Sequence, residues 1–160
     1  MKVCQLVTHT KIDYKQKQSK ENMKYFLDTC IWRDFYENRF SKRGAHLGEF
    51  ASKLFKKIIK EKSKIIFSKS IIKELSIDYN SNDINNMLNL LIYANVLERI
   101  EIKEEEYKEA KKISAERKLP FIDVLNAIQA RNHNAILVSQ DKHFAKLSDI
   151  IKFKRPQELI

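Results

Sequence analysis

The sequence predicts an α/β protein, with one mostly parallel sheet and helices on both of its faces. Short apolar runs of strand length alternate along the chain with longer segments of helical periodicity. The 160 residues and the hydrophobic fraction of 43% suit a single domain with a sizeable core. Two apolar runs, ending at Asp28 and Asp141, each lead into an aspartate. In open α/β sheets the rim at the strand ends is where ligands bind.

Five runs are expected to form strands, because each is short, apolar and bounded by polar residues. They cover residues 25–27, 64–67, 96–102, 135–138 and 150–153.

Helices are expected between these strands. The clearest covers 47–59, where apolar residues recur at i, i+3 and i+4. Others are expected at 31–40, 71–75, 84–92, 104–118 and 120–130. Ser68 or Ser70 is a candidate cap for the helix at 71–75, and Asp83 for the next one. Tyr107 and Ala110 are expected on the inner face of the helix at 104–118.

Composition narrows the class of partner and the compartment. A net charge of +10 indicates an anionic partner, most simply nucleic acid, although lysine-rich coding bias would give the same excess. Cys4 and Cys30 form no disulfide framework, which fits a reducing cytoplasm. We expect neither a membrane span nor a signal peptide. Residues 1–22 are expected to be a basic, flexible tail or a misassigned start, followed by one domain over 23–160.

Four acids lie at the ends of expected elements or beside apolar residues: Asp28, Glu74, Asp123 and Asp141. Each has an ordinary structural explanation. Asp28 and Asp141 could cap the turns that follow them, Asp123 could favour a helix N-terminus, and Glu74 could be a solvated surface residue. Clustered carboxylates raise one another's pKa, so a shared site makes physical sense with a divalent cation such as Mg²⁺ or Mn²⁺.

The ordered set of four motifs resembles the PIN-domain ribonucleases, which include VapC-type toxins of toxin–antitoxin pairs. The resemblance covers about residues 24 to 159 and rests on the segments 25–29, 68–75, 119–127 and 136–144. In that order they match the segments that carry the family's four acids, here Asp28, Glu74, Asp123 and Asp141. Ser139 occupies the family's usual Thr/Ser position, and residues 154–158 resemble the family's end.

The resemblance implies a PIN-like three-layer fold with sheet order 3-2-1-4-5, which would place Asp28 beside Asp141. It also implies a metal-dependent endoribonuclease. Asp28, Asp123 and Asp141 would hold Mg²⁺ or Mn²⁺, with Glu74 as a ligand or orienting base. Ser139 would orient a carboxylate or a water. The implied partners are RNA and, if the protein is a toxin, an antitoxin that covers the acidic rim.

Several residues depart from the family pattern or carry weaker expectations. Cys30 stands where many members carry Asn, and Asn126 where His is common. Asp34 is either a fifth acid near the site or, as we expect, a residue on the helix surface. Arg131, Lys142 and His143 lie close in sequence to the acids and could contact phosphate or solvent.

Three alternatives remain at this stage. A PIN-like module could bind RNA or an assembly partner without cutting it. A phosphoacceptor signalling domain would also place aspartates on a sheet rim, but its Lys at a later strand end has no convincing match. The aromatic helix at 31–40 and the helix at 47–59 could form a homodimer face or ordinary core.

Overall fold

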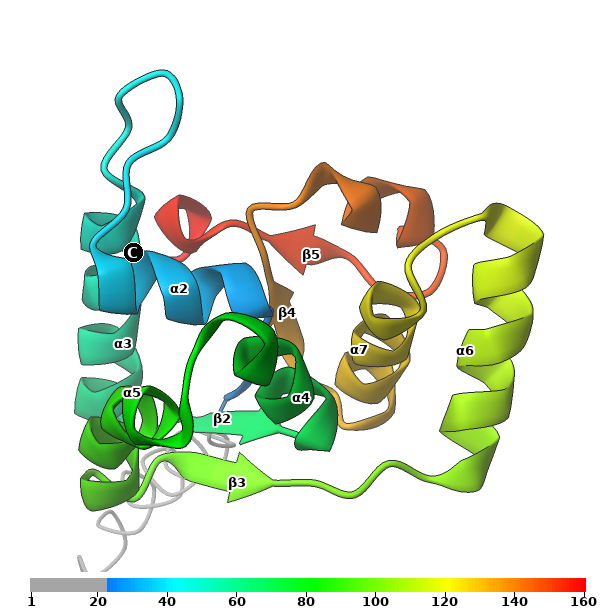
Figure 1. Ribbon diagram of the computed structural model, residues 1–160, viewed down its shortest axis with the longest axis horizontal. Coiled ribbons are helices and arrows are strands. Elements are labelled where there is room, and N and C mark those ends of the chain that lie inside the picture. Colours follow the sequence, from blue (N-terminus) through cyan, green and yellow to red (C-terminus); the bar gives the residue numbers. More distant parts are fainter. Residues whose placement is uncertain (1–22) are drawn as a thin grey trace, which may run out of the picture.

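A five-stranded, wholly parallel sheet in the order β3-β2-β1-β4-β5 forms the centre of the protein (Figure 1). This is seen in a computed structural model, which describes residues 23–160; the predicted tail, 1–22, lies outside the described residues. The predicted α/β class and sheet order are confirmed. The strands are β1 (Lys24–Leu27), β2 (Lys64–Phe67), β3 (Leu97–Arg99), β4 (Ile136–Val138) and β5 (Phe153–Lys154).

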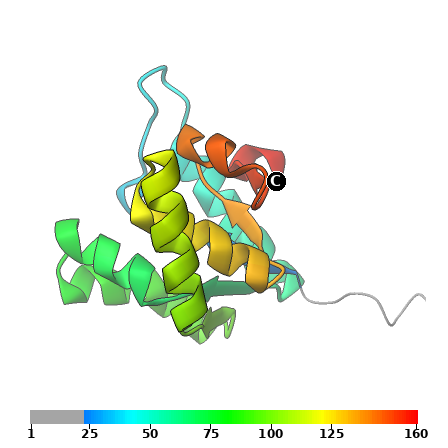
Figure 2. The same cartoon turned by 90° about the vertical axis from the view of Figure 1, so that its right-hand side faces the viewer.

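Helices lie on both sides of the sheet and give three layers. In Figures 1 and 2, α2 and α3 lie on one side of β4, while α7 and α6 lie on the other. The helices are α2 (Thr29–Glu37), α3 (Leu47–Glu61), α4 (Lys69–Asp78), α5 (Ser81–Tyr93), α6 (Glu104–Arg117) and α7 (Phe121–Asn132), with 3₁₀ turns η1 (Lys142–Leu147) and η2 (Pro156–Glu158). None of the helices within residues 23–160 combines the length and apolar character needed to cross a membrane.

An aromatic cluster fixes α2 to the end of β1. Trp32 is fully buried, and its Nε1 donates a hydrogen bond to the Leu27 carbonyl oxygen at 3.1 Å. The Phe55 ring packs against both Trp32 and Phe35, with centroids 5.5 and 4.6 Å apart. These aromatic residues of α2 and α3 therefore belong to the core, and the homodimer stays a prediction. This packing also fixes the position of Asp28, which lies between β1 and α2.

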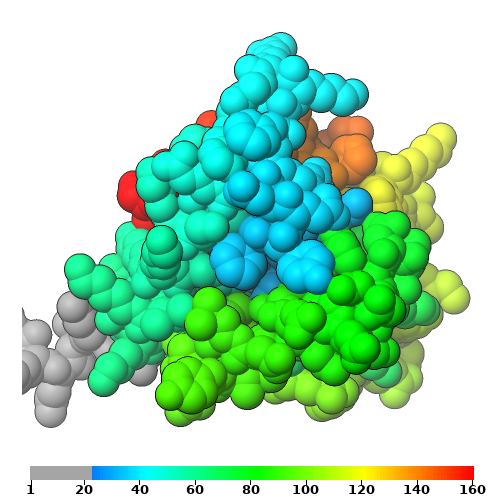
Figure 3. Space-filling view, turned by 60° about the vertical axis from the view of Figure 1, so that its left-hand side comes forward, coloured from blue at the N-terminus to red at the C-terminus, as the bar shows by residue number. Residues whose placement is uncertain are grey.

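The segment between α2 and α3 projects from the body (Figures 1 and 2). Helix α2 ends at Glu37 rather than at residue 40, because Asn38 adopts a left-handed conformation with φ of 51°. Phe40 consequently lies on the projecting loop, 60% exposed and stacked on the His46 ring. The space-filling view shows the loop rising above the surface that α2, α3 and α5 share (Figure 3).

Two strands, β3 and β5, differ from the predicted ranges by more than one residue at one end, and hydrogen bonding explains both differences. The backbone N–H groups of Ile150 and Ile151 both donate to the Leu147 carbonyl, so they complete the η1 turn and the last strand starts later, at Phe153. Strand β3 is shorter than predicted because its partner β2 ends at Phe67, where Ser68 begins to cap α4. The predicted cap at Ser68 is thus confirmed.

Two helix expectations were wrong. Asn80, not Asp83, is the N-cap of α5, and its Oδ1 accepts a hydrogen bond from the Asp83 backbone N–H at 3.0 Å. Asp83 instead accepts one from the Tyr36 hydroxyl at 2.8 Å. Tyr107 was expected on the inner face of α6, but it is 49% exposed while Ala110 is buried. The exposed Tyr107 ring lies against Phe121 on the neighbouring helix.

Candidate active site

The sheet topology brings the four predicted acids to one rim. Asp28 follows β1 and Asp141 comes just after β4, and these strands are neighbours in the sheet. The Asp28 backbone N–H donates to the Val138 carbonyl at 2.9 Å, which joins the two strand ends directly. Glu74 lies in α4, and Asp123 lies in the first turn of α7. Parallel strands present their carboxyl ends at the same edge, so Asp28 and Asp141 share one rim. The charges of Asp28, Asp141 and Glu74 all act on Asp123, so the four acids lie near one another.

The Asp28 carboxylate is held by three donors. Its Oδ1 accepts the Thr29 backbone N–H at 2.8 Å, as the N-cap of α2. Its Oδ2 accepts the Ser139 hydroxyl at 2.7 Å and the Cys30 thiol at 3.1 Å. Only 6% of Asp28 is exposed, and this burial raises its pKa, while the three hydrogen bonds oppose the rise. The capping explanation is therefore correct, but it accounts for only one of the two oxygens.

Ser139 connects the two strand-end aspartates. It is fully buried, its hydroxyl donates to Asp28, and the same oxygen accepts the Asp141 backbone N–H at 2.9 Å. A single hydroxyl thus fixes the Asp28 carboxylate relative to the backbone that carries Asp141. The predicted role of Ser139 in orienting a carboxylate is consistent with this arrangement.

Glu74 is tied to the same site through Thr29. The Thr29 hydroxyl donates to Glu74 Oε2 at 2.6 Å, across 45 positions of sequence. Burial raises the pKa of Glu74, and the nearby Asp28 charge adds to the rise. Since Thr29 is the first residue of α2, it places Glu74 next to Asp28, the residue that follows β1.

Asp123, Asp141 and His143 form the open side of the site. One ligand-type atom from each lies within 4.8 Å of the other two. His143 Nδ1 is 3.6 Å from Asp123 Oδ2 and 3.4 Å from Asp141 Oδ2. Asp141 Oδ1 also accepts the His143 backbone N–H at 2.8 Å and so caps η1. The His143 ring therefore lies between two acids. The sequence had left open whether His143 contacts phosphate or solvent.

Electrostatic coupling shows that the four acids share one environment. The pKa of Asp123 rises to about 7, first because of burial and then because of repulsion from Asp28, Asp141 and Glu74, while His143 opposes the rise. A carboxyl that resists ionisation near neutral pH is the expected consequence of clustered acids without a neutralising charge.

This donor set fits a hard divalent cation. Carboxylate oxygens are the ligands that Mg²⁺ and Mn²⁺ prefer, and a positive charge here would relieve the repulsion that raises the pKa of Asp123. Asp28, Glu74, Asp123 and Asp141 are the residues that could hold it. Ser139 and Thr29 hold two of these carboxylates by hydrogen bonds and would be the outer partners of a bound ion.

Asp34 is not where it was expected, and Arg131 pairs with another acid. Asp34 is 1% exposed rather than on the helix surface, with Arg39 Nε at 3.3 Å, and burial raises its pKa to about 6. Arg131 donates two hydrogen bonds of 2.8 Å to the Glu109 carboxylate, near the end of α7 opposite Asp123. A phosphate contact for Arg131 is therefore not favoured.

Sequence reasoning missed the contacts of Thr29 and Cys30. Thr29 directly follows Asp28 at a helix start. A hydroxyl in that position was the sequence signal that could have pointed to a role for Thr29 at the site. Burial and the Asp28 charge raise the pKa of the Cys30 thiol well above its usual value, so the S–H group persists as a donor to Asp28. Asn126, by contrast, is fully buried and accepts the Ser70 hydroxyl at 3.0 Å, which is an interior contact.

Comparison with known proteins agrees with the fold. The family model of the PIN domain matches residues 25–150. Among solved structures the chain is similar to VapBC2 from Rickettsia felis bound to a DNA fragment from their promoter, with a TM-score of 0.57 and 20% identity over 83% of this chain and 98% of that chain.

Two other solved structures show the same fold. A toxin–antitoxin complex from Klebsiella pneumoniae gives a TM-score of 0.51 and 17% identity, over 76% of this chain and 90% of that chain. PAE2754 from Pyrobaculum aerophilum gives a TM-score of 0.50 and 16% identity, over 86% and 93%. No curated protein matches the sequence. From the family match and the strand order, the chain belongs to the PIN-domain family.

Proposed function

We propose that this protein is a cytoplasmic, metal-dependent endoribonuclease that hydrolyses RNA phosphodiesters at the four-acid site. The observation that carries the proposal is the convergence of Asp28, Glu74, Asp123 and Asp141 on one rim, where burial and then repulsion from the other three acids raise the pKa of Asp123. A module that only binds RNA gains nothing from concentrated negative charge at its ligand site, which favours cleavage over binding alone.

Each residue of the site has a distinct task in this reaction. Asp28, Asp123 and Asp141 would hold Mg²⁺ or Mn²⁺, and such an ion supplies water activation and stabilisation of the leaving oxygen. Ser139 and the Thr29 backbone fix the Asp28 carboxylate. The Thr29 hydroxyl donates a hydrogen bond to Glu74 Oε2. The other oxygen, Oε1, would then orient the attacking water or accept its proton.

The net charge and the structurally similar proteins support the proposed substrate and partner. The net charge of +10 favours a polyanion, and the phosphate backbone of RNA supplies it. Structures of a VapBC2 complex and of a toxin–antitoxin complex share the fold, which supports a toxin role. In that role an antitoxin would cover the acidic rim, and its coding sequence would be expected next to that of the toxin.

Cleavage of an end-labelled pool of single-stranded RNA tests the proposal. The full chain is expected to cut the pool with Mg²⁺ or Mn²⁺ and to stop when EDTA is added. Asp28→Asn should abolish cutting while its circular dichroism spectrum stays that of the wild type. Asp149→Asn, which alters an exposed acid paired with Arg117, is the matched control and should retain activity. Wild-type activity in Asp28→Asn would refute the assignment.

A further inference from the structure

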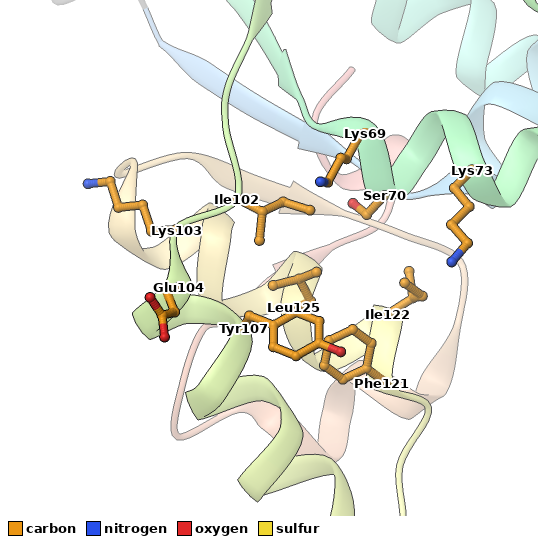
Figure 4. Close-up of a pocket in the computed structure, with 10 residues that line it drawn as sticks. All are labelled: Lys69, Ser70, Lys73, Ile102, Lys103, Glu104, Tyr107, Phe121, Ile122 and Leu125. Carbon is orange, nitrogen blue, oxygen red and sulfur yellow. The ribbon is translucent and has the colours of Figure 1, made fainter.

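A groove lies beside the four-acid site and takes no part in it. It has a volume of about 460 Å³ and is bounded by α4, the segment that leads into α6, and the first turns of α6 and α7 (Figure 4). This volume lies within the range of small-molecule sites, about 300–1,000 Å³. The groove is therefore large enough for a discrete ligand group.

Aromatic and aliphatic side chains form the inner wall of the groove. The Tyr107 and Phe121 rings meet edge to face, with centroids 5.0 Å apart and planes at 63°. Ile102 and Leu125 lie next to them (Figure 4). Tyr107 remains 49% exposed, so its ring is accessible to a ligand. A flat, accessible ring of this kind offers a stacking surface.

Two lysines of α4 provide positive charge at the groove. Lys69 and Lys73 extend over it from the side opposite the aromatic pair (Figure 4). The ion pairs formed within residues 23–160 involve neither of them. Glu104 is also at the groove, but its carboxylate is 2.5 Å from Lys108 Nζ and points away in Figure 4.

The groove and the candidate active site take residues from the same two helices, α4 and α7. Lys73 directly precedes Glu74 in α4, and Ile122 directly precedes Asp123 in α7. A chain that crosses the four-acid rim would therefore reach the groove within a short distance. Whatever binds there is expected to be part of the same polymer.

We propose that this groove is a nucleobase subsite, in which one base of the RNA strand stacks on Tyr107 and a flanking phosphate binds Lys69 and Lys73. The inference rests on the proposed ribonuclease function and adds a determinant of how the strand is placed. A nucleotide matches both parts of the groove, since its base is flat and its phosphate is anionic. An apolar protein segment would match the aromatic wall alone and would leave the two ammonium groups without partners.

Binding measured without cleavage tests the subsite separately from the catalytic proposal. The probe is a fluorescein-labelled, single-stranded 12-nucleotide RNA of mixed sequence, titrated with the full chain in EDTA. Tyr107→Ala is expected to raise the Kd about 5- to 150-fold, the typical effect of losing one stacked base. Tyr107→Phe keeps the ring and should bind within about twofold of the wild type. Tyr93→Ala removes a 91% exposed tyrosine from α5 and is the matched control, with no expected effect.

The phosphate contact has its own readout. Lys73→Ala should lower the slope of log K against log salt by about 0.7, the value for one phosphate contact on a single strand. Lys112→Ala, at an exposed position on α6, should leave that slope unchanged. Thermal melts establish that each variant folds.

The outcomes separate the two proposals. If Tyr107→Ala binds RNA as tightly as Tyr93→Ala does, the subsite is refuted, even where the wild type cleaves RNA. Loss of binding to a purified protein partner with RNA affinity intact would assign the groove to that partner and also refute the subsite. If Tyr107→Ala weakens RNA binding but the wild type never cuts RNA with Mg²⁺, the subsite stands and the ribonuclease proposal fails.

Discussion

Replacing Asp123 with asparagine is expected to stabilise the metal-free protein at pH 8. The pKa of this carboxyl is raised from about 4 to about 7 by burial and by three neighbouring acids. Between these values the folded protein binds more protons than the unfolded chain, so stability falls as the pH rises from 4 to 7. Above pH 7 the full cost of the buried charge is present, and the neutral amide of Asp123→Asn avoids it.

The magnitude follows from the shift. About 3 pKa units at 1.36 kcal/mol each give a ceiling of about 4 kcal/mol. The Asp123 side chain is 13% exposed, and screening by solvent lowers the expected gain in the free energy of unfolding to about 2 kcal/mol. For a protein of this size that corresponds to a rise in Tm of about 4–8 °C.

Thermal unfolding followed by circular dichroism in EDTA measures this effect at two pH values. At pH 8 the Tm of Asp123→Asn should be higher than that of the wild type. At pH 5 the difference should shrink to about one third, because only about one of the three pH units between the unfolded and folded pKa lies below pH 5. Asp149→Asn is a control of opposite sign, because Arg117 holds the pKa of Asp149 at about 2 and its loss should lower the Tm at pH 8. A wild type more stable than Asp123→Asn at pH 8 would refute the account of the clustered charge.

Three further substitutions probe two supports of the site and one close backbone contact between α2 and α3. Ser139→Ala removes a buried donor to Asp28, so activity should fall about 10- to 100-fold in a cleavage assay. Thr29→Val keeps the shape but loses the bond to Glu74, and kcat should fall about tenfold with KM for RNA unchanged. Gly48→Ala would place a Cβ 2.6 Å from a backbone Cα just after α2, and urea unfolding should show a loss of about 1–3 kcal/mol or more. Wild-type behaviour in any of these assays would contradict the corresponding contact.

The strand-end acids could be predicted from sequence because an apolar run that ends in an acid identifies a strand and its rim. The sheet order that places Asp28 beside Asp141 was implied by the resemblance to the PIN domain, and the structure confirms it. The helix at 47–59 was likewise visible, since its apolar stripe is broad. These local patterns can be recognised without knowing which elements pack together in the folded protein.

Other features depend on tertiary partners that periodicity does not reveal. The Thr29–Glu74 hydrogen bond joins residues 45 positions apart, and no local pattern predicts it. Asp34 is polar and was placed on the surface, but it turns inward toward Arg39. Tyr107 was placed in the core from its spacing on a charged helix, yet the small Ala110 makes the buried contact and leaves the larger ring exposed.

Titration calorimetry with Mn²⁺ tests most directly whether the four carboxylates form one cation site. The full-length wild type should show saturable binding, and Asp28→Asn and Asp141→Asn should each weaken it at least about tenfold. Asp149→Asn should bind as the wild type does, because that acid is paired with Arg117 outside the site. Unchanged Mn²⁺ affinity in Asp28→Asn and Asp141→Asn would contradict the central claim.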